Sequence, residues 1–537
     1  MASSRPQFLR GLLLGAALTS VLALAAASPA TAASVVSPDT GPTTGGTTVS
    51  LAATTLGFKQ IAHGNNTGYA LSGDGRVYAW GTNGSHELGN GGTTVSAVPV
   101  PISAGAIPIG ATIKQIAAGW SSGYALASDG AVYAWGANYA GQLGDDLTDS
   151  PSVPVAVDLS AVRPHTTIVS IAAGQSDGYA LASNGELYAW GYNNDGELGD
   201  GDNSDVSAAT PVSRSAMPPG VTFTSVAAGQ NAAYAVGSDG KVYAWGSDTS
   251  DALGLGVSGD KNVPTAIAAG AIPSGVKMTA VAGGQEGGYA LGDDGHVYAW
   301  GSDTYGDLGD GHNADSDSPV KVVAGSIPRG VRLVGLSAGS ASGYALGSDG
   351  KAYGWGKGGD GQLGAPAADT NVPVALNIGV APAGVSFSAV SGGYHCVIVL
   401  GSDGRVYGSG DNFRGDLGDG TSTPRSGFVL GPNATISDVS FGGVAGTNVI
   451  DPPGVTTVLT PPHAVGAVAV LVSGSVVGGT TPGTATTRTI PAAFTYAFAL
   501  AETGVVFPWW LLWIGCAAIA VGAILVWRRP LIQTLRW

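Results

Sequence analysis

Two short motifs in this chain match patterns that carry chemistry in other proteins. Residues 119–123 read Gly-Trp-Ser-Ser-Gly, the pattern of a nucleophilic serine, which needs a strand-to-helix turn to expose its hydroxyl. Residues 356–361 match the glycine spacing of a dinucleotide-binding loop, which needs a following helix to hold the pyrophosphate. Neither motif precedes a helical pattern, and residues 174–178 repeat the first one. Both therefore arise from a sequence repeat, and we expect no catalytic residue.

Metal-binding patterns are equally weak. Seven histidines show no paired ligand spacing; they are His63, His86, His165, His296, His312, His395 and His463. Acidic stretches such as residues 310–315 offer oxygen ligands, but they lack the spacing of an EF-hand loop. We interpret them as solvated turns, with Ca²⁺ binding as the alternative, and expect no metal and no other cofactor.

The repeat itself is the dominant feature. Seven copies carry close variants of Tyr-Ala-Leu, then Asp-Gly, then Val-Tyr-Ala-Trp-Gly, which reads as two short strands around a tight turn. Serine replaces the tryptophan in the seventh copy, at Ser409. No copy contains a helix-length amphipathic pattern, so residues 56–430 predict an all-β, seven-bladed β-propeller with four strands per blade. The six tryptophans are 55 residues apart; they are Trp80, Trp135, Trp190, Trp245, Trp300 and Trp355.

These copies resemble the repeats of the regulator of chromosome condensation (RCC1) family. The match is clearest in residues 119–144, GWSSGYALASDGAVYAWGANYAGQLG, and extends over about residues 58–430. The first member of that family is a nuclear exchange factor for a small GTPase. The rest of this chain departs from that setting, so the resemblance implies the fold and leaves the function open.

Positions that vary among the copies are free for recognition. The residue after each Ala-Gly varies, and the loop after each Trp-Gly varies and contains aromatic residues. Aromatic side chains on rigid loops are common binding anchors. The alternative is that several pack against neighbouring blades. The candidate binding residues are Trp120, Tyr139, Tyr192, Tyr305, Tyr394 and Phe413.

The N-terminal end reads as an export signal. Arg5 and Arg10 precede an apolar stretch over residues 11–27, and Ala30-Thr31-Ala32 is a small-x-small cleavage site. We expect residues 1–32 to be removed as a signal peptide. The alternative, a membrane anchor, is disfavoured by the short apolar stretch.

The C-terminal end reads as a surface anchor. Residues 505–527 are uncharged and would span about 34 Å as a helix, which predicts a transmembrane helix with residues 528–537 as a basic cytoplasmic tail. Just before the span stands Leu500-Ala501-Glu502-Thr503-Gly504. This order resembles an LAxTG-type cell-wall sorting signal. The resemblance implies that a sortase cleaves after Thr503 and links it to the wall; the alternative is a permanent single-pass anchor.

Composition agrees with export. The chain has only two cysteines, Cys396 and Cys516, and the second lies in the apolar span. Residues 33–503 hold 17 basic and 37 acidic residues, a net charge of −20. A surface of this sign repels phosphate, so we expect no nucleic acid partner.

The segments that flank the propeller form a second predicted domain. Residues 36–49 resemble the opening of an immunoglobulin-like IPT/TIG domain, and its continuation appears in residues 439–445, 460–463, 468–472 and 493–496. We therefore expect residues 33–55 and 431–496 to form one β-sandwich into which the propeller is inserted. The alternative is two unrelated β segments.

These features predict a non-enzymatic bacterial cell-surface protein that displays a propeller to bind an extracellular protein or glycan. The expected processing partner is a sortase. Two alternatives stay open. One is a propeller inhibitor of an extracellular enzyme such as a β-lactamase, a role known within the RCC1 repeat family. The other is a propeller lyase or glycan hydrolase, which convergent acidic residues at the ring centre would favour.

Overall fold

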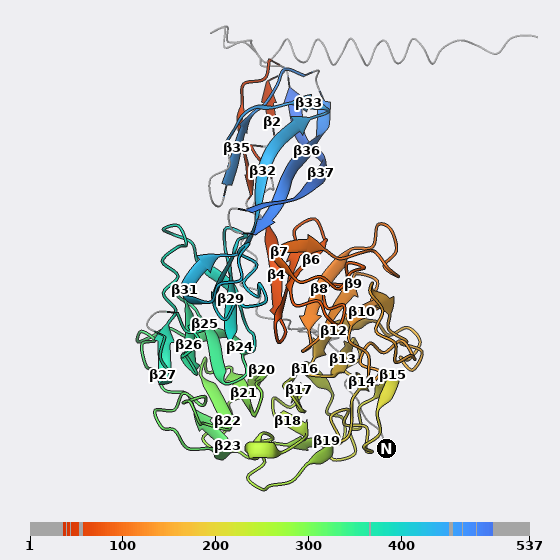
Figure 1. Cartoon of the computed structure of the whole chain (residues 1–537), viewed down its shortest axis with the longest axis vertical. Coiled ribbons are helices and arrows are strands. Elements are labelled where there is room, and N and C mark those ends of the chain that lie inside the picture. Colours follow the sequence, from red (N-terminus) through yellow and green to blue (C-terminus); the bar gives the residue numbers. More distant parts are fainter. Residues whose placement is uncertain are drawn as a thin grey trace, which may run out of the picture.

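The computed structural model describes residues 36–52 and 57–497, apart from residues 39, 43, 365–366, 451–454, 464–465 and 479–480. Within these described ranges, one 3₁₀ helix, η2 (Thr249–Asp251), accompanies the strands. Figure 1 shows a ring of sheets with a smaller unit beyond its rim. The predicted signal peptide, sorting motif, apolar span and basic tail lie outside the described residues. Among the residues described, no helix has the length and apolarity to cross a membrane.

Seven four-stranded sheets form the ring, and each takes its four strands from one sequence copy. From the ring centre outward the strands follow chain order.

The innermost strands are β4 (Phe58–His63), β8 (Ile113–Ala118), β12 (Ile168–Ala173), β16 (Phe223–Ala228), β20 (Met278–Gly283), β24 (Leu333–Ala338) and β28 (Phe387–Gly392). The second strands are β5 (Thr67–Ser72), β9 (Ser122–Ala127), β13 (Asp177–Ala182), β17 (Ala232–Gly237), β21 (Gly287–Gly292), β25 (Ser342–Gly347) and β29 (Cys396–Gly401). The third strands are β6 (Val77–Gly81), β10 (Val132–Gly136), β14 (Leu187–Gly191), β18 (Val242–Gly246), β22 (Val297–Gly301), β26 (Ala352–Gly356) and β30 (Val406–Gly410). The outermost strands are β7 (Ser96–Pro101), β11 (Val155–Ala156), β15 (Val206–Pro211), β19 (Lys261–Ala266), β23 (Ser316–Lys321), β27 (Thr370–Ala375) and β31 (Arg425–Leu430).

The predicted all-β propeller of repeated four-stranded sheets is confirmed. The hairpins fall where the Asp-Gly turns predicted them. Strand β11 is shorter than the other outer strands and pairs with β10 through only Val155 and Ala156.

Buried tryptophans join six of the seven blades to the blade before them. The indole of Trp135 is fully buried, and its Nε1–H donates to the carbonyl oxygen of Glu87 in the preceding blade (2.9 Å). The hydroxyl of Tyr69 donates to the same oxygen (2.7 Å), and the two rings meet edge to face at 5.7 Å. All six repeat tryptophans make this indole bond, at 2.7–2.9 Å. Each inter-blade contact therefore combines apolar burial with a satisfied polar group.

A small residue opposite each tryptophan makes room for the ring. Gly123 pairs with Trp135 across the hairpin, and a Cβ added to Gly123 would lie 2.5 Å from the indole. Alanine takes this place in the fourth copy, where Ala233 pairs with Trp245. The repeat thus specifies a large and a small residue as a matched pair.

The seventh copy changes all members of this packing together. Val397 faces Ser409 where the other copies have a small residue facing tryptophan. Phe428 of β31 packs against Gly364, whose counterparts in the other blades touch a tryptophan. Ser409 keeps a polar link to the preceding blade, because its hydroxyl donates to the carbonyl oxygen of Gly361 (2.7 Å). The volume lost with the indole is thus supplied by valine and phenylalanine.

The first and seventh blades share no strand, and side-chain contacts together with a few backbone hydrogen bonds close the ring between them. Trp80 donates to the carbonyl oxygen of Asp416 (2.8 Å). The seventh copy has Ile398 where the others have the bonding tyrosine, and His63 Nε2 lies 3.1 Å from the same oxygen. The backbone N–H of His63 also donates to the Ser391 hydroxyl (3.0 Å). A histidine from blade one thus occupies the place of the missing tyrosine.

Two further sheets build the smaller unit. One has the order β1 (Val36–Ser37), β3 (Thr48–Ala52), β35 (Val455–Leu459) and β34 (Thr447–Ile450). The other has the order β2 (Thr40–Pro42), β37 (Thr481–Ala497), β36 (Gly466–Gly478), β32 (Pro432–Phe441) and β33 (Val444–Ala445).

The segments before and after the ring pair directly in this outer unit. Thr48 is opposite Leu459 in the antiparallel β3–β35 pair, and β2 runs parallel to β37. Val49, Phe441 and Val472 are fully buried in it. The assignment of this unit to the IPT/TIG domains stays a prediction.

The outer unit also touches the junction where the ring closes. Val476 of β36 is buried in one apolar cluster with Trp80 of blade one and Val406 of blade seven. Gly478 lies so close to the Gly418 carbonyl oxygen that an added Cβ would sit 2.4 Å from it. The unit stands off the rim next to β7 and leaves the ring centre uncovered (Figure 1).

We expect Trp190→Ala to destabilise the propeller by about 3–5 kcal/mol, because it removes a buried indole and leaves the Gln142 carbonyl with one donor fewer.

Ser409→Trp should also destabilise the propeller, because the indole would collide with Val397. Adding Val397→Gly to that variant should restore part of the loss. Urea unfolding followed by far-ultraviolet circular dichroism measures all three; equal stabilities of the single and double variants would contradict the matched-pair interpretation.

Candidate recognition surface

The strand register separates the loops into two faces. Because Thr67 is opposite Gly81, the loop after each innermost strand and the loop after each third strand lie at the same end of the blades. We call this end the loop face. It comprises residues 64–66, 119–121, 174–176, 229–231, 284–286, 339–341 and 393–395, and residues 82–95, 137–154, 192–205, 247–260, 302–315, 357–364, 367–369 and 411–424.

The opposite end is the turn face. It comprises the Asp-Gly turns at residues 73–76, 128–131, 183–186, 238–241, 293–296, 348–351 and 402–405. It also comprises the connections between blades at residues 102–112, 157–167, 212–222, 267–277, 322–332 and 376–386.

All six aromatic residues predicted from the sequence belong to the loop face. Phe413, Tyr139 and Tyr305 are exposed, by 71%, 68% and 40%, whereas the other three are half-buried. Trp120 and Tyr394 stand on the short inner loops beside the ring centre. The other four stand on the longer loops after the third strands.

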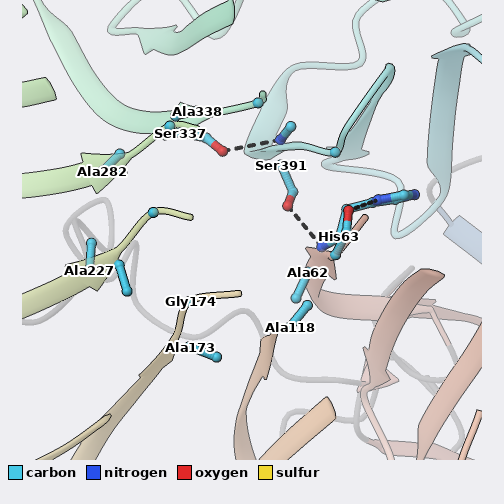
Figure 2. A pocket seen from close by; sticks show the side chains of 18 of the residues that line it. Ala62, His63, Ala118, Ala173, Gly174, Ala227, Ala282, Ser337, Ala338 and Ser391 are labelled. Atoms are coloured by element: carbon cyan, nitrogen blue, oxygen red, sulfur yellow. Dashed lines mark hydrogen bonds between the residues drawn. The ribbon is translucent and has the colours of Figure 1, made fainter. Parts of the chain in front are cut away.

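A cavity of about 300 Å³ occupies the ring centre, lined by the seven innermost strands. Figure 2 shows small side chains along it, among them Ala118, Ala173 and Ala227. Among its described lining residues there is no acidic residue, lysine, arginine or cysteine, and the one histidine is His63. Paired acid and base groups, which hydrolytic or lyase chemistry requires, are therefore not assembled by these residues.

Trp120 and Tyr394 meet at the mouth of this cavity although 274 positions separate them. Their rings pack edge to face with centroids 5.9 Å apart. Asn65 lies between them, since its N–H donates to the Trp120 carbonyl and its carbonyl accepts from the Tyr394 N–H (3.3 Å each). The Oδ1 atom of Asn65 and the Oε1 atom of Gln175, on an equivalent loop, are buried without a hydrogen-bond donor. The mouth therefore presents an aromatic pair that comes from two different blades.

A charged cluster next to Tyr394 was missed by sequence reasoning. His395 stacks edge to face on Tyr394 at 4.1 Å, and its Nδ1 lies 2.5 Å from Asp360. Lys357 bonds the same carboxylate (3.0 Å) and stands 5.7 Å from the ring centre of Tyr305. The cluster thus connects Tyr394 to Tyr305. Its only sequence signal is that lysine and histidine occupy positions where the other copies are mostly small or uncharged.

The remaining aromatics are not brought into this group. The Tyr139 hydroxyl is 2.6 Å from the Ser176 hydroxyl of the next blade, which fixes the ring on its loop. Phe413 bonds Asp411 through its backbone N–H (3.1 Å) and leaves its ring in solvent. Tyr192 is half-buried on the loop of blade three.

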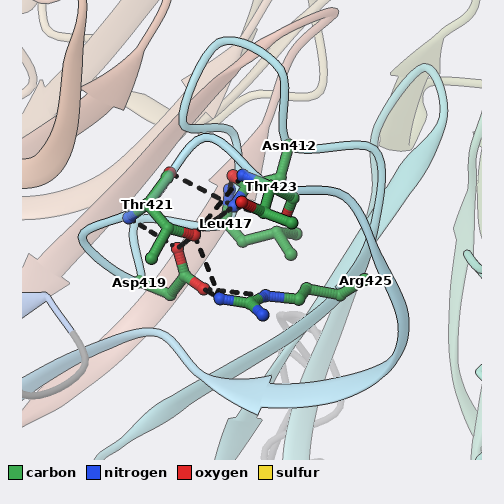
Figure 3. A network of polar contacts seen from close by, with 6 residues as sticks. All are labelled: Asn412, Leu417, Asp419, Thr421, Thr423 and Arg425. Carbon is green, nitrogen blue, oxygen red and sulfur yellow. Dashed lines mark hydrogen bonds and ion pairs between the residues drawn. The ribbon is translucent and has the colours of Figure 1, made fainter.

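A polar side chain holds six of the seven long loops in a defined shape: it is an asparagine in blades one, two, three and seven and an aspartate in blades four and five. In blade seven, Asn412 Oδ1 accepts the Leu417 N–H (2.9 Å), and its Nδ2 donates to Asp419 and to the Thr423 carbonyl (3.1 Å each; Figure 3). Arg425 bonds Asp419 at 2.8 Å. Burial opposes ionisation of Asp419, but hydrogen bonds from Thr421 and Arg425 outweigh it and lower its pKa. Exposed aromatics such as Phe413 therefore project from a preorganised frame.

Comparison with known families agrees with this geometry. The profile of the RCC1-like domain matches residues 41–390, more than half of the chain. The chain belongs to the RCC1-like domain family.

Relatives of this RCC1-like chain have diverse names. It is 32% identical to the human E3 ubiquitin-protein ligase HERC2 over 66% of its own length, but spans only 7% of HERC2. It is 34% identical to the ultraviolet-B receptor UVR8 of Arabidopsis thaliana, over 57% of this chain and 67% of UVR8.

Solved structures share the fold at low identity. Yeast RCC1 (Prp20), solved bound to Kap60, matches with a TM-score of 0.58 and 20% identity, over 75% of this chain and 90% of the other. Human WBSCR16 matches with a TM-score of 0.58 and 21% identity, over 72% and 99%.

Three buried carboxyl groups are expected to make the stability of the RCC1-like ring depend on pH. Burial raises the pKa values of Glu197, Asp307 and Asp416 to about 7 each. The pKa of an aspartate or glutamate in the unfolded chain is about 4. When folding raises this pKa, the protonated group stabilises the folded state fully below about pH 4, and this stabilisation is lost as the pH rises through the pKa of the folded state.

We therefore expect the melting temperature to be higher at about pH 5 than at about pH 8. The variant E197Q/D307N/D416N should show a smaller difference, because its three side chains stay neutral. Thermal melts across this range, followed by circular dichroism, measure both proteins. An identical pH dependence of variant and wild type would contradict this assignment.

Proposed function

We propose that this chain is a bacterial cell-surface protein that uses the loop face of its propeller to bind an extracellular protein or glycan. The observation that carries the proposal is that all six aromatic candidates belong to one face, and that two of them, Trp120 and Tyr394, meet at a cavity whose described lining lacks an acid–base pair. Preorganised loops lower the entropic cost of binding, which suits a recognition surface. The binding and regulatory roles in the names of family members are consistent with this type of function.

The cell-surface part rests on the sequence. An export signal in residues 1–32, the sorting motif at Leu500–Gly504 and the apolar stretch of residues 505–527 support a sortase-processed wall protein. The outer unit fits an IPT/TIG sandwich that holds the propeller near its attachment point. Inhibition of an extracellular enzyme remains a special case of protein binding, whereas the lining of the cavity disfavours a lyase or hydrolase at the ring centre.

Binding is tested with the propeller and its outer unit immobilised as wild type and as W120A/Y394A. We expect the wild type to retain a specific ligand from pools of extracellular proteins and glycans, and the double variant to lose it, since the aromatic pair forms the mouth. A turn-face variant, D129N/D293N, should retain the ligand. If W120A/Y394A still retained the ligand and D129N/D293N lost it, the binding site would lie on the turn face, which would contradict the proposal.

Anchoring is tested at Thr503. Wild-type protein should be released from cells only by a wall hydrolase, because sortase would link Thr503 to the wall. Thr503→Ala should remain in the membrane through residues 505–527 and be extractable by detergent. Full-length wild type in the detergent extract would show instead that the apolar stretch is a permanent anchor.

A further inference from the structure

The two faces of the ring carry very different charge. The loop face contains 22 acidic and two basic residues. The turn face contains nine acidic and nine basic residues. The acidity noted in the sequence is therefore concentrated on the same face as the aromatic residues.

Burial does not remove this asymmetry. Seven of the 22 acidic residues are buried and serve the loops themselves, such as Asp419 with Arg425 and Asp303 with the Leu308 N–H. Fifteen acidic side chains of the loop face remain exposed or half-exposed, whereas its only basic residues are Lys357 and Arg414. Lys357 is already paired with Asp360. The field above the loop face is thus strongly negative.

Two simpler explanations fit poorly. Acidic residues that served only solubility would be expected on both faces, but the turn face has equal numbers of acidic and basic residues. A metal site needs converging ligands, and among the residues described no group of three or more histidine, cysteine, aspartate or glutamate side chains is suitably placed. Separate carboxylates spread over several blades match a ligand whose positive charges are also spread out.

We propose that the loop face recognises a cationic protein segment rich in lysine or arginine; this rests on the function proposed above and names its partner class. Basic side chains would lie along the acidic loops of blades two to five. One of them would reach the mouth, where the Trp120 and Tyr394 rings offer cation–π contacts. Charge complementarity would also speed the encounter.

The test uses fluorescein-labelled deca-lysine and measures its binding by fluorescence anisotropy at low and high salt. The loop-face variant is D202N/D315N and the turn-face control is D129N/D293N. Each of these four carboxylates is exposed and accepts one backbone N–H, which an asparagine oxygen still can do. The two variants therefore change the net charge by the same amount, and both are expected to preserve the local backbone hydrogen bonds.

We expect D202N/D315N to weaken binding about three- to tenfold at low salt, and D129N/D293N to change it less than about twofold. Trp120→Ala should weaken binding by about fivefold at both salt concentrations, since the cation–π contact is short-ranged. Equal effects of the two double variants would overturn the proposal, because binding would then reflect net charge alone. Displacement of the peptide by stoichiometric Ca²⁺ would also overturn it.

The outcome also separates this proposal from the proposed function. If deca-lysine does not bind but W120A/Y394A still abolishes capture of an extracellular ligand, the loop face is the site and its partner is not cationic. If neither deca-lysine nor any ligand depends on loop-face residues, both proposals are wrong.

Discussion

One backbone carbonyl per blade organises the ring. In most blades that carbonyl accepts a tyrosine hydroxyl from its own blade and an indole N–H from the next, as Glu87 does with Tyr69 and Trp135. Both donors are buried, so losing either would leave a polar group unsatisfied in the core. The geometry of neighbouring blades is thereby fixed by directional bonds as well as by apolar packing. The small residue opposite each tryptophan of the repeat, and the spacing of the copies, follow from this requirement.

A frame held in this way leaves the loops free to vary. The repeated parts of each copy face the neighbouring blades, while Tyr305 and Phe413 project from long loops whose shape is set by the buried side chains of Asp303 and Asn412. Charge follows the same division, since acidic residues gather on the loop face and are balanced on the turn face. Rigid blades that carry loops with variable side chains are the arrangement expected of a recognition surface.

The fold could be predicted from the sequence because it follows from a local repeat. The candidate site was harder to predict because it depends on contacts between residues far apart in the sequence. The hairpin motif with Asp-Gly turns indicated the strands, the ring and the face-lining aromatics. It did not indicate that Trp120 touches Tyr394, because no periodicity relates these two loops to the closure of a ring. Nor did it reveal that Val397 and Phe428 replace the indole lost at Ser409, or that His63 replaces the tyrosine lost at Ile398. Such compensation depends on which blades become neighbours, and that is a property of the assembled structure.

The pairing within the outer unit sets an order of events during folding. Each blade forms from a single continuous segment, so hairpins and blades can assemble locally and early. Thr47 bonds Thr460 across 413 positions, so the outer unit must wait until nearly the whole described chain is available. Until then blades one and seven have exposed apolar flanks, including Trp80 and Val406, that Val476 later helps to cover. The slowest and most aggregation-prone species on the pathway should therefore be a nearly complete ring whose two ends have not yet met.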